Sequence, residues 1–270
     1  MRLHNKRTKI NFIIFLLIAI IYAIGNFIWW SINTPIIPTW ESAIHFVDVF
    51  KRGYLFYNAP LLAYIMRFMF YIFGKEYFDL TVIFVNYIFF LISLYFIYKI
   101  GVELKDKETG NIAMILFALV PAVYGMSRQY GRQEYHIMVA ITFNIYCLIK
   151  TDYFRDRKWS ILYGISVGLG LMIKDVFLMY FFVPFIYNLI ICLKDKFDKT
   201  KLINIVVATF IGFFICGWHY FRSEIIKKLS GDPFKNTVSV FEFENLRVMT
   251  IGLWEELLSP PIFILFAVGL

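Results

Sequence analysis

Long apolar runs separated by short basic segments dominate this sequence of 270 residues. The first run, residues 10–30, is long enough to cross the roughly 30 Å hydrocarbon layer of a bilayer. Hydrophobic residues make up 60% of the chain and charged residues 17%, which is more apolar side chain than one soluble core of this size can bury. The bilayer must therefore act as its solvent, and we expect an all-α, polytopic integral membrane protein.

About seven to eight transmembrane helices are expected from the run lengths. After the first run, spans are predicted at 80–98, 111–126, 137–149, 160–173, 176–193 and 202–218, and a last span opens near Pro260. Residues 61–73 are too short to span and contain Arg67, so we expect an interfacial or re-entrant helix there. Because the sequence stops inside the last apolar run, we interpret 1–270 as one truncated transmembrane domain.

The N-terminus has the charge pattern of a membrane anchor. Arg2, Lys6, Arg7 and Lys9 precede the first apolar run. A secretory signal peptide is the alternative, but its apolar region spans about 7–15 residues and ends in small side chains. Here the run is longer and ends in bulky aromatic residues, which favours an uncleaved signal anchor.

Charge bias predicts how the spans are oriented. If 61–73 does not span, four segments lie on one side of the membrane and hold more than half of the 27 Lys and Arg residues: the N-terminus, 99–110, 150–159 and 194–201. The positive-inside tendency then places the N-terminus in the cytoplasm and two sizeable loops, 31–79 and 219–258, outside. The net charge of +8 fits anionic lipid headgroups better than a nucleic acid.

The first external loop contains a polar stripe. A proline before residues 40–52 and a glycine after them predict a helix at the outer surface. Glu41, His45 and Asp48 lie four and three residues apart, so they share one face of that helix. They offer two possible general bases and a titratable imidazole. A solvated polar face on an interfacial helix is the alternative.

A second cluster of ionisable residues lies in the short turn between two predicted spans. Arg128, Arg132, Glu134 and His136 occupy this turn. Ionisable groups beside a membrane are costly unless they meet a partner or a substrate, and guanidinium groups suit phosphate oxygens. The alternative is a solvated loop in which Arg132 pairs with Glu134.

Lys174 and Asp175 separate two spans that have almost no loop between them. A lysine at that surface can hold a lipid phosphate as a point charge, although snorkelling to the interface would explain it equally well. Gly164 and Gly168, at four-residue spacing in the preceding span, indicate close helix packing.

Soluble-type nucleotide chemistry has no support in the sequence. It contains no P-loop, dinucleotide fingerprint, GxSxG or HExxH motif. The three cysteines lie inside apolar runs without metal-ligand spacing, so we expect small buried side chains. No ligand set is complete enough to assert a metal, and a divalent metal stays open as a cofactor.

The order of these motifs resembles the GT-C glycosyltransferases that use polyprenyl-phosphate sugars, especially the protein O-mannosyltransferase and lipid A aminoarabinose transferase group. In that group, an acidic motif on an interfacial helix precedes a His-Pro-Pro-Leu-like segment, and the counterparts here are 40–42 and 58–61. The usual Asp-Glu pair keeps only Glu41, and Asn58 and Ala59 replace the His and first Pro.

The later motifs continue the resemblance. Residues 127–134 look like the family's Ser-Arg and acidic stretch, and 168–174 look like its Gly-Leu-Ala-Leu-Leu-Thr-Lys segment. The resemblance implies a GT-C-like membrane enzyme, in a prokaryotic plasma membrane, that transfers a sugar from a polyprenyl-phosphate donor to a lipid, glycan or protein acceptor.

The resemblance also gives the polar residues roles. Glu41 and Asp48 would act as base or orienter, while Lys174, Arg128 and Arg132 would hold the departing phosphate. His45 would contact a substrate, and Glu134 and His136 would orient the acceptor or help bind a divalent metal. A membrane transporter, whose polar residues line a substrate path, and a non-catalytic membrane scaffold remain the alternatives.

Overall fold

A computed structural model describes residues 2–33, 60–126, 133–174, 176–194 and 198–230 of the chain. Within these ranges all regular structure is helical, as predicted, with nine α-helices, one 3-10 turn and no strand. The elements are α1 (Arg2–Asn33), α3 (Pro60–Phe73), η2 (Lys75–Tyr77), α4 (Phe78–Leu104), α5 (Lys107–Ala118), α6 (Pro121–Met126), α7 (Gln133–Lys150), α8 (Arg157–Ile173), α9 (Phe177–Lys194) and α10 (Lys199–Ser230).

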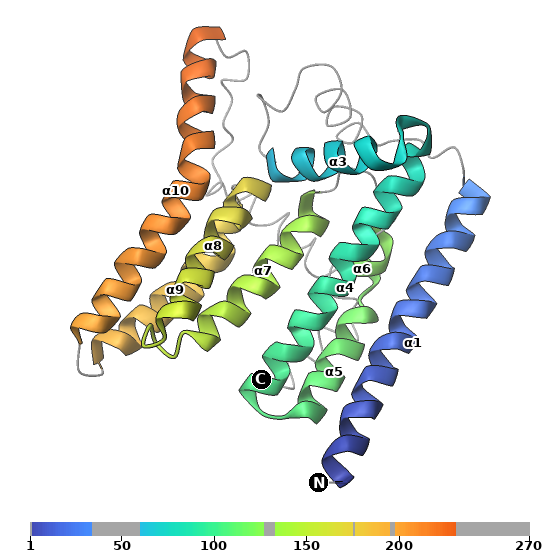
Figure 1. The fold of residues 1–270 in the computed structure, drawn as a ribbon, viewed down its shortest axis with the longest axis horizontal. Helices are drawn as coiled ribbons and strands as arrows, with labels where there is room; N and C mark the ends of the chain where they lie inside the picture. The colour runs from blue at the N-terminus through green and yellow to red at the C-terminus, as the bar shows by residue number, and fades with distance from the viewer. Residues whose placement is uncertain (1, 34–59, 127–132, 175, 195–197, 231–270) are drawn as a thin grey trace, which may run out of the picture.

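The long helices run side by side and alternate in direction, whereas α3 lies across their ends (Figure 1). We call the end of the bundle that carries α3 the α3 face; it includes the helix ends at Asn33, Phe78, Gln133 and Ile173. The opposite end, the basic face, holds the helix ends at Arg2, Leu104, Lys150 and Lys194. The four basic segments thus lie at one end, and α3 has the crosswise placement expected of an interfacial helix.

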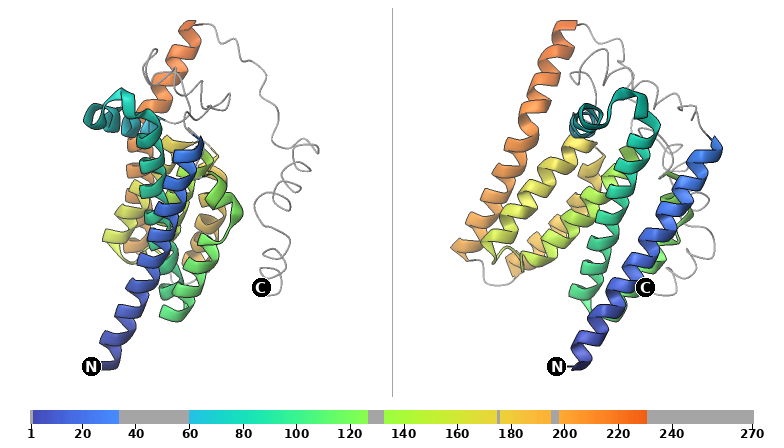
Figure 2. Two further views of the ribbon diagram at one scale, coloured as in Figure 1. Left: turned by 90° about the vertical axis from the view of Figure 1, so that its right-hand side faces the viewer. Right: turned by 45° about the vertical axis from the view of Figure 1, so that its right-hand side comes forward.

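Three of the described helices are long and apolar enough to cross a membrane, at Ile13–Ile32, Asp79–Leu104 and Lys199–Gly217. Shorter apolar helices, among them α7 and α9, lie between them (Figure 2). The predicted helix at 40–52 and the final span near Pro260 lie outside the described residues. Where a loop was expected from 219, α10 stays helical to Ser230.

The predicted single span at 111–126 is wrong in one respect, because a break divides it into α5 and α6. Pro121 has no backbone N–H for an intrahelical hydrogen bond, and its ring disfavours helical geometry at Val120. The Leu119 N–H bonds to the Ile115 carbonyl, and the Val120 N–H bonds to that of Phe117 (3.2 Å), so the chain tightens before α6 begins.

Two tyrosines hold α1 against the bundle. The Tyr22 hydroxyl donates to the Ala118 carbonyl of α5 (2.7 Å), and its ring stacks on Phe90 of α4 with centroids 3.8 Å apart. The Tyr87 hydroxyl of α4 donates to the Ala19 carbonyl (2.9 Å). Because hydrocarbon offers no competing hydrogen-bond partner, such bonds between helices help fix their positions.

Helices α8 and α10 pack closely against each other, as the glycine spacing predicted. A Cβ atom on Gly168 would lie 2.6 Å from the Ile215 Cβ and 2.9 Å from the Gly212 carbonyl oxygen. Only small residues permit two backbones to approach this closely. Nearby, the Asn144 amide of α7 donates to the buried Ser166 hydroxyl of α8 (2.8 Å), which joins a third helix to the pair.

At the basic face, Asp106 begins α5. Its side chain accepts from the Thr109 backbone N–H at 2.8 Å, which satisfies one of the free donors of the first helical turn. This hydrogen bond holds the pKa of Asp106 below its ordinary value of 3.8. Nearby, Lys150 at the end of α7 pairs with Glu103 of α4 at 3.2 Å.

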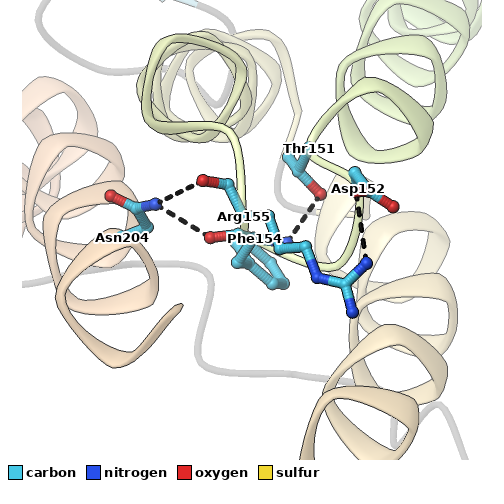
Figure 3. Close-up of polar contacts among 5 residues, drawn as sticks. All are labelled: Thr151, Asp152, Phe154, Arg155 and Asn204. Atoms are coloured by element: carbon cyan, nitrogen blue, oxygen red, sulfur yellow. Dashed lines mark hydrogen bonds and ion pairs between the residues drawn. The ribbon is translucent and has the colours of Figure 1, made fainter. Parts of the chain in front are cut away.

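The turn between α7 and α8 has an unusual backbone. Residues 152–154 all have positive φ, of 47°, 56° and 64°. Each such non-glycine residue costs on the order of 1 kcal/mol or more. Asn204 of α10 holds the turn by donating to the carbonyls of Phe154 (2.8 Å) and Arg155 (3.3 Å), and the Thr151 hydroxyl accepts from the Phe154 N–H (Figure 3).

Replacing Asn204 with alanine is expected to lower the free energy of unfolding by about 1–3 kcal/mol, because a buried donor is lost from a strained turn. The midpoint of thermal unfolding in detergent micelles measures the loss. Asn188→Ala is the matched control, since its amide donates to the Pro184 carbonyl of its own helix and not to a second helix among the described residues. An equal shift in both variants would contradict the role given to Asn204.

Candidate functional site

An apolar cluster on the α3 face joins helices that are distant in sequence. Ile137 of α7, Ile173 of α8 and Phe177 of α9 are buried together, and Leu61 of α3 packs against them. Ile137 follows Glu134 by three residues, and Ile173 immediately precedes Lys174. The cluster therefore brings three of the segments singled out by the sequence to one place.

The first of these segments starts α3. Pro60 is its first residue, a position where the missing backbone N–H has no cost and the fixed φ suits a helix. Leu61 follows and anchors this end of α3 on the cluster. Asn58 and Ala59, which precede it in the motif, lie outside the described residues.

Lys174 occupies the junction between α8 and α9. Its backbone N–H donates to the Gly170 carbonyl (3.2 Å), and its own carbonyl accepts from the Phe177 N–H (3.0 Å). The Lys174 backbone is extended, with φ −163° and ψ 141°, so the chain leaves α8 at this residue. Hydrogen bonds on both sides thus fix the backbone of a partly exposed lysine at the α3 face.

Gly170 makes this junction possible. A Cβ atom on Gly170 would lie 2.5 Å from the ring of Phe177, which is fully buried. The glycine in the 168–174 motif therefore has a packing function, since it lets the start of α9 lie against the end of α8. The sequence motif pointed to Gly170, but nothing in the sequence identified Phe177 as its partner.

Glu134 and His136 lie at the start of α7. The backbone of Glu134 belongs to the first turn of α7. The His136 side chain is buried, and its ring meets Phe89 of α4 edge to face, with centroids 4.8 Å apart. His136 thus packs between α7 and α4, and its contact with a substrate stays a prediction.

The remaining predicted site residues, Glu41, His45, Asp48, Arg128 and Arg132, lie outside the described residues. The structure therefore brings together the start of α3, the start of α7 and Lys174, and it leaves the other positions as predictions. Among the described ranges, no three His, Cys, Asp or Glu side chains gather as a metal site would require. The three cysteines are buried and free, as expected.

A protein-family model matches the part of the chain that contains these elements. The sequence model described as dolichyl-phosphate-mannose-protein mannosyltransferase matches residues 57–219, from the segment before α3 into α10. No curated protein and no solved structure matches the chain. The family match covers more than half of the 270 residues and contains both Leu61 and Lys174. The chain therefore belongs to the dolichyl-phosphate-mannose-protein mannosyltransferase family.

Proposed function

We propose that this integral membrane glycosyltransferase moves a sugar from a polyprenyl-phosphate carrier to a lipid, glycan or protein acceptor at the α3 face. The observation that carries the proposal is the apolar cluster that gathers the start of α3, the start of α7 and the α8–α9 junction. Lys174 lies at that junction, on a backbone that hydrogen bonds hold in place. A lysine whose backbone is held beside a membrane surface suits a lipid phosphate.

The distribution of Lys and Arg residues predicts on which side of the membrane each face of the bundle lies. The basic face carries four Lys- and Arg-rich segments, and such segments stay in the cytoplasm. The α3 face then lies outside, in the plasma membrane of a prokaryote by the resemblance of its motifs. A donor held there has its phosphate at the outer surface and its hydrocarbon tail in the adjacent leaflet.

In the proposed reaction, an acceptor hydroxyl or similar nucleophile attacks the anomeric carbon of the sugar. The bond from that carbon to the phosphate oxygen breaks, and the polyprenyl phosphate leaves with the electron pair. Glu41, together with Asp48, takes the proton or orients the nucleophile. Lys174, Arg128 and Arg132 stabilise the charge that grows on the departing phosphate.

The remaining predicted residues handle substrates. His45 lies on the same predicted helix face as Glu41 and can contact the donor or the acceptor. Glu134 and His136 would orient the acceptor from the start of α7. Adding and chelating divalent metal during sugar transfer decides whether a metal takes part.

Replacing Glu41 with glutamine is expected to lower sugar transfer by about 100- to 10,000-fold, because the amide cannot accept a proton. Transfer is measured with the full-length protein in membranes and a radiolabelled polyprenyl-phosphate sugar, and donor binding is measured in parallel. Glu108→Gln, an exposed carboxylate on the basic face, is the control and should transfer normally. Normal transfer by Glu41→Gln at equal expression would contradict the catalytic role of Glu41. No transfer by either the wild type or the variant would favour a non-catalytic scaffold.

A further inference from the structure

Two lysines lie beside one pair of aromatic rings on the basic face, where α7 lies between α4 and α8 (Figure 1). The Lys99 ammonium of α4 lies over the ring of Tyr146 in α7, 5.9 Å from its centroid. The Lys150 ammonium, at the end of α7, lies over the ring of Trp159 in α8 at 5.7 Å. The two rings meet edge to face with centroids 5.5 Å apart, so one aromatic pair holds both cations.

Lys99 lies inside a candidate membrane span. The span runs from Asp79 to Leu104, so Lys99 is more than one helical turn from its end. Lysine side chains near the end of a span extend toward the interface, where the phosphates of lipids lie. The Lys99 side chain is partly exposed, and exposure within a span means contact with lipid. Its ammonium can therefore reach the phosphates of the adjacent leaflet.

The carboxylates of the basic face leave Lys99 without an ion pair. Glu103, one turn after Lys99, pairs with Lys150 at 3.2 Å. Within the part of the chain that the structure describes, no carboxylate lies within ion-pair distance of the Lys99 ammonium. A partly buried cation without a counter-charge is costly, so an anionic ligand would be stabilised beside it. Three further carboxylates are engaged as helix caps or in a local ion pair: Asp106, Asp152 and Asp156.

The surroundings of Lys99 favour a lipid as the source of that anion. Ile92 and Tyr95 precede Lys99 at spacings of three and four residues, so the three share one stripe of α4. Ile92 is 37% exposed and Tyr95 is 49% exposed, both within the span. A phospholipid whose phosphate meets Lys99 can therefore lay an acyl chain along apolar side chains of the same helix.

The balance of charge selects among phospholipids. Lys99, Lys150 and Glu103 together carry one net positive charge. A lipid with a net negative charge complements this group, whereas the headgroup ammonium of a zwitterionic lipid brings a second positive charge to it.

We propose that the seam between α4, α7 and α8 on the basic face binds the phosphate of an anionic phospholipid. Lys99 makes the main contact and Lys150 the second, while Tyr146 and Trp159 hold the two ammonium groups in place. The acyl chain lies along the exposed stripe of α4. The site is at the opposite end of the bundle from the α3 face and does not depend on sugar transfer.

The test measures lipid binding to the full-length protein by native mass spectrometry from detergent micelles. Phosphatidylglycerol and phosphatidylethanolamine with identical acyl chains are titrated separately. We expect the wild type to bind phosphatidylglycerol more tightly, and Lys99→Gln to bind it about fivefold more weakly, the usual effect of one lysine near an anionic surface. Lys194→Gln removes the same charge from an exposed position at the end of α9, on the same face, and should bind as the wild type does.

Glu103→Gln tests the site by a gain of binding, which a misfolded variant could not produce. The change removes a carboxylate and releases Lys150 from its ion pair, so phosphatidylglycerol should bind about fivefold more tightly. Lys99→Arg keeps the charge and should bind more tightly than Lys99→Gln. Phosphatidylglycerol should also raise the midpoint of thermal unfolding more in the wild type than in Lys99→Gln.

Four results would overturn the proposal. They are equal binding of the two lipids by the wild type, equal losses in Lys99→Gln and Lys194→Gln, unchanged or weaker binding in Glu103→Gln, and binding of free glycerol phosphate as tight as that of the lipid. The last result would identify a site for a soluble phosphate.

Discussion

Replacing Lys174 with alanine is expected to lower kcat/KM for sugar transfer by about 100- to 1000-fold, the usual effect of removing one charged or hydrogen-bonding group from a transition state. The expectation rests on the fixed backbone of Lys174, which is hydrogen-bonded to Gly170 on one side and to Phe177 on the other. Steady-state kinetics with a labelled polyprenyl-phosphate sugar measure the loss.

Two further variants test whether the loss comes from the charge at position 174 itself. Lys174→Arg keeps the charge but changes its shape, so we expect activity between that of the wild type and Lys174→Ala. Lys158→Ala removes an exposed lysine near the other end of the same helix, on the basic face, and should leave transfer unchanged. Equal losses of kcat/KM in Lys158→Ala and Lys174→Ala would show a general effect of charge. That result would refute a specific contact between Lys174 and the phosphate.

Replacing Gly164 with alanine is expected to destabilise the bundle by about 1–3 kcal/mol, as overpacking a filled interface does. The new Cβ atom would lie 2.9 Å from the Ala208 Cα of α10 and closer still to the Ala208 carbonyl oxygen. Both are backbone atoms, so the two helices would have to move apart. The loss appears as a lower midpoint of thermal unfolding in detergent.

Gly125→Ala is the matched control for this change. Gly125 lies in α6, and an added Cβ there meets no atom within 4 Å. The same substitution should therefore be neutral or slightly stabilising at that position, since alanine favours a helix over glycine. If Gly164→Ala were as stable as Gly125→Ala, the contact between α8 and α10 could not be as close as described.

Periodic and local features of the chain were predictable from the sequence. Run length and charge bias predicted the alternating helices and predicted that 61–73 is interfacial or re-entrant; α3 lies across the bundle end. Spacing of small residues predicted the packing around Gly168. Each of these features depends on the composition of a single segment. Such composition can be read from the sequence without knowing the tertiary structure.

Features that depend on contacts between distant segments were not predictable. Nothing in the sequence indicated that Leu61 would meet Ile173, or that Gly170 would make room for Phe177. The break before Pro121 carried a local signal, the proline itself, which the long apolar run outweighed.

The roles of the polar residues that precede α3 rest on motif order, while Lys174 has both a motif and a defined place in the fold.

Sugar transfer by the full-length protein is the most direct test of the central claim, that the α3 face carries out transfer from a lipid-borne donor. Membranes that contain the protein are incubated with radiolabelled polyprenyl-phosphate sugars, and the lipid, glycan and protein fractions are then extracted and counted. We predict that label leaves the polyprenyl phosphate and appears in one acceptor fraction, and that Lys174→Ala slows this transfer by about 100- to 1000-fold. If no polyprenyl-phosphate sugar serves as donor, the claim is contradicted.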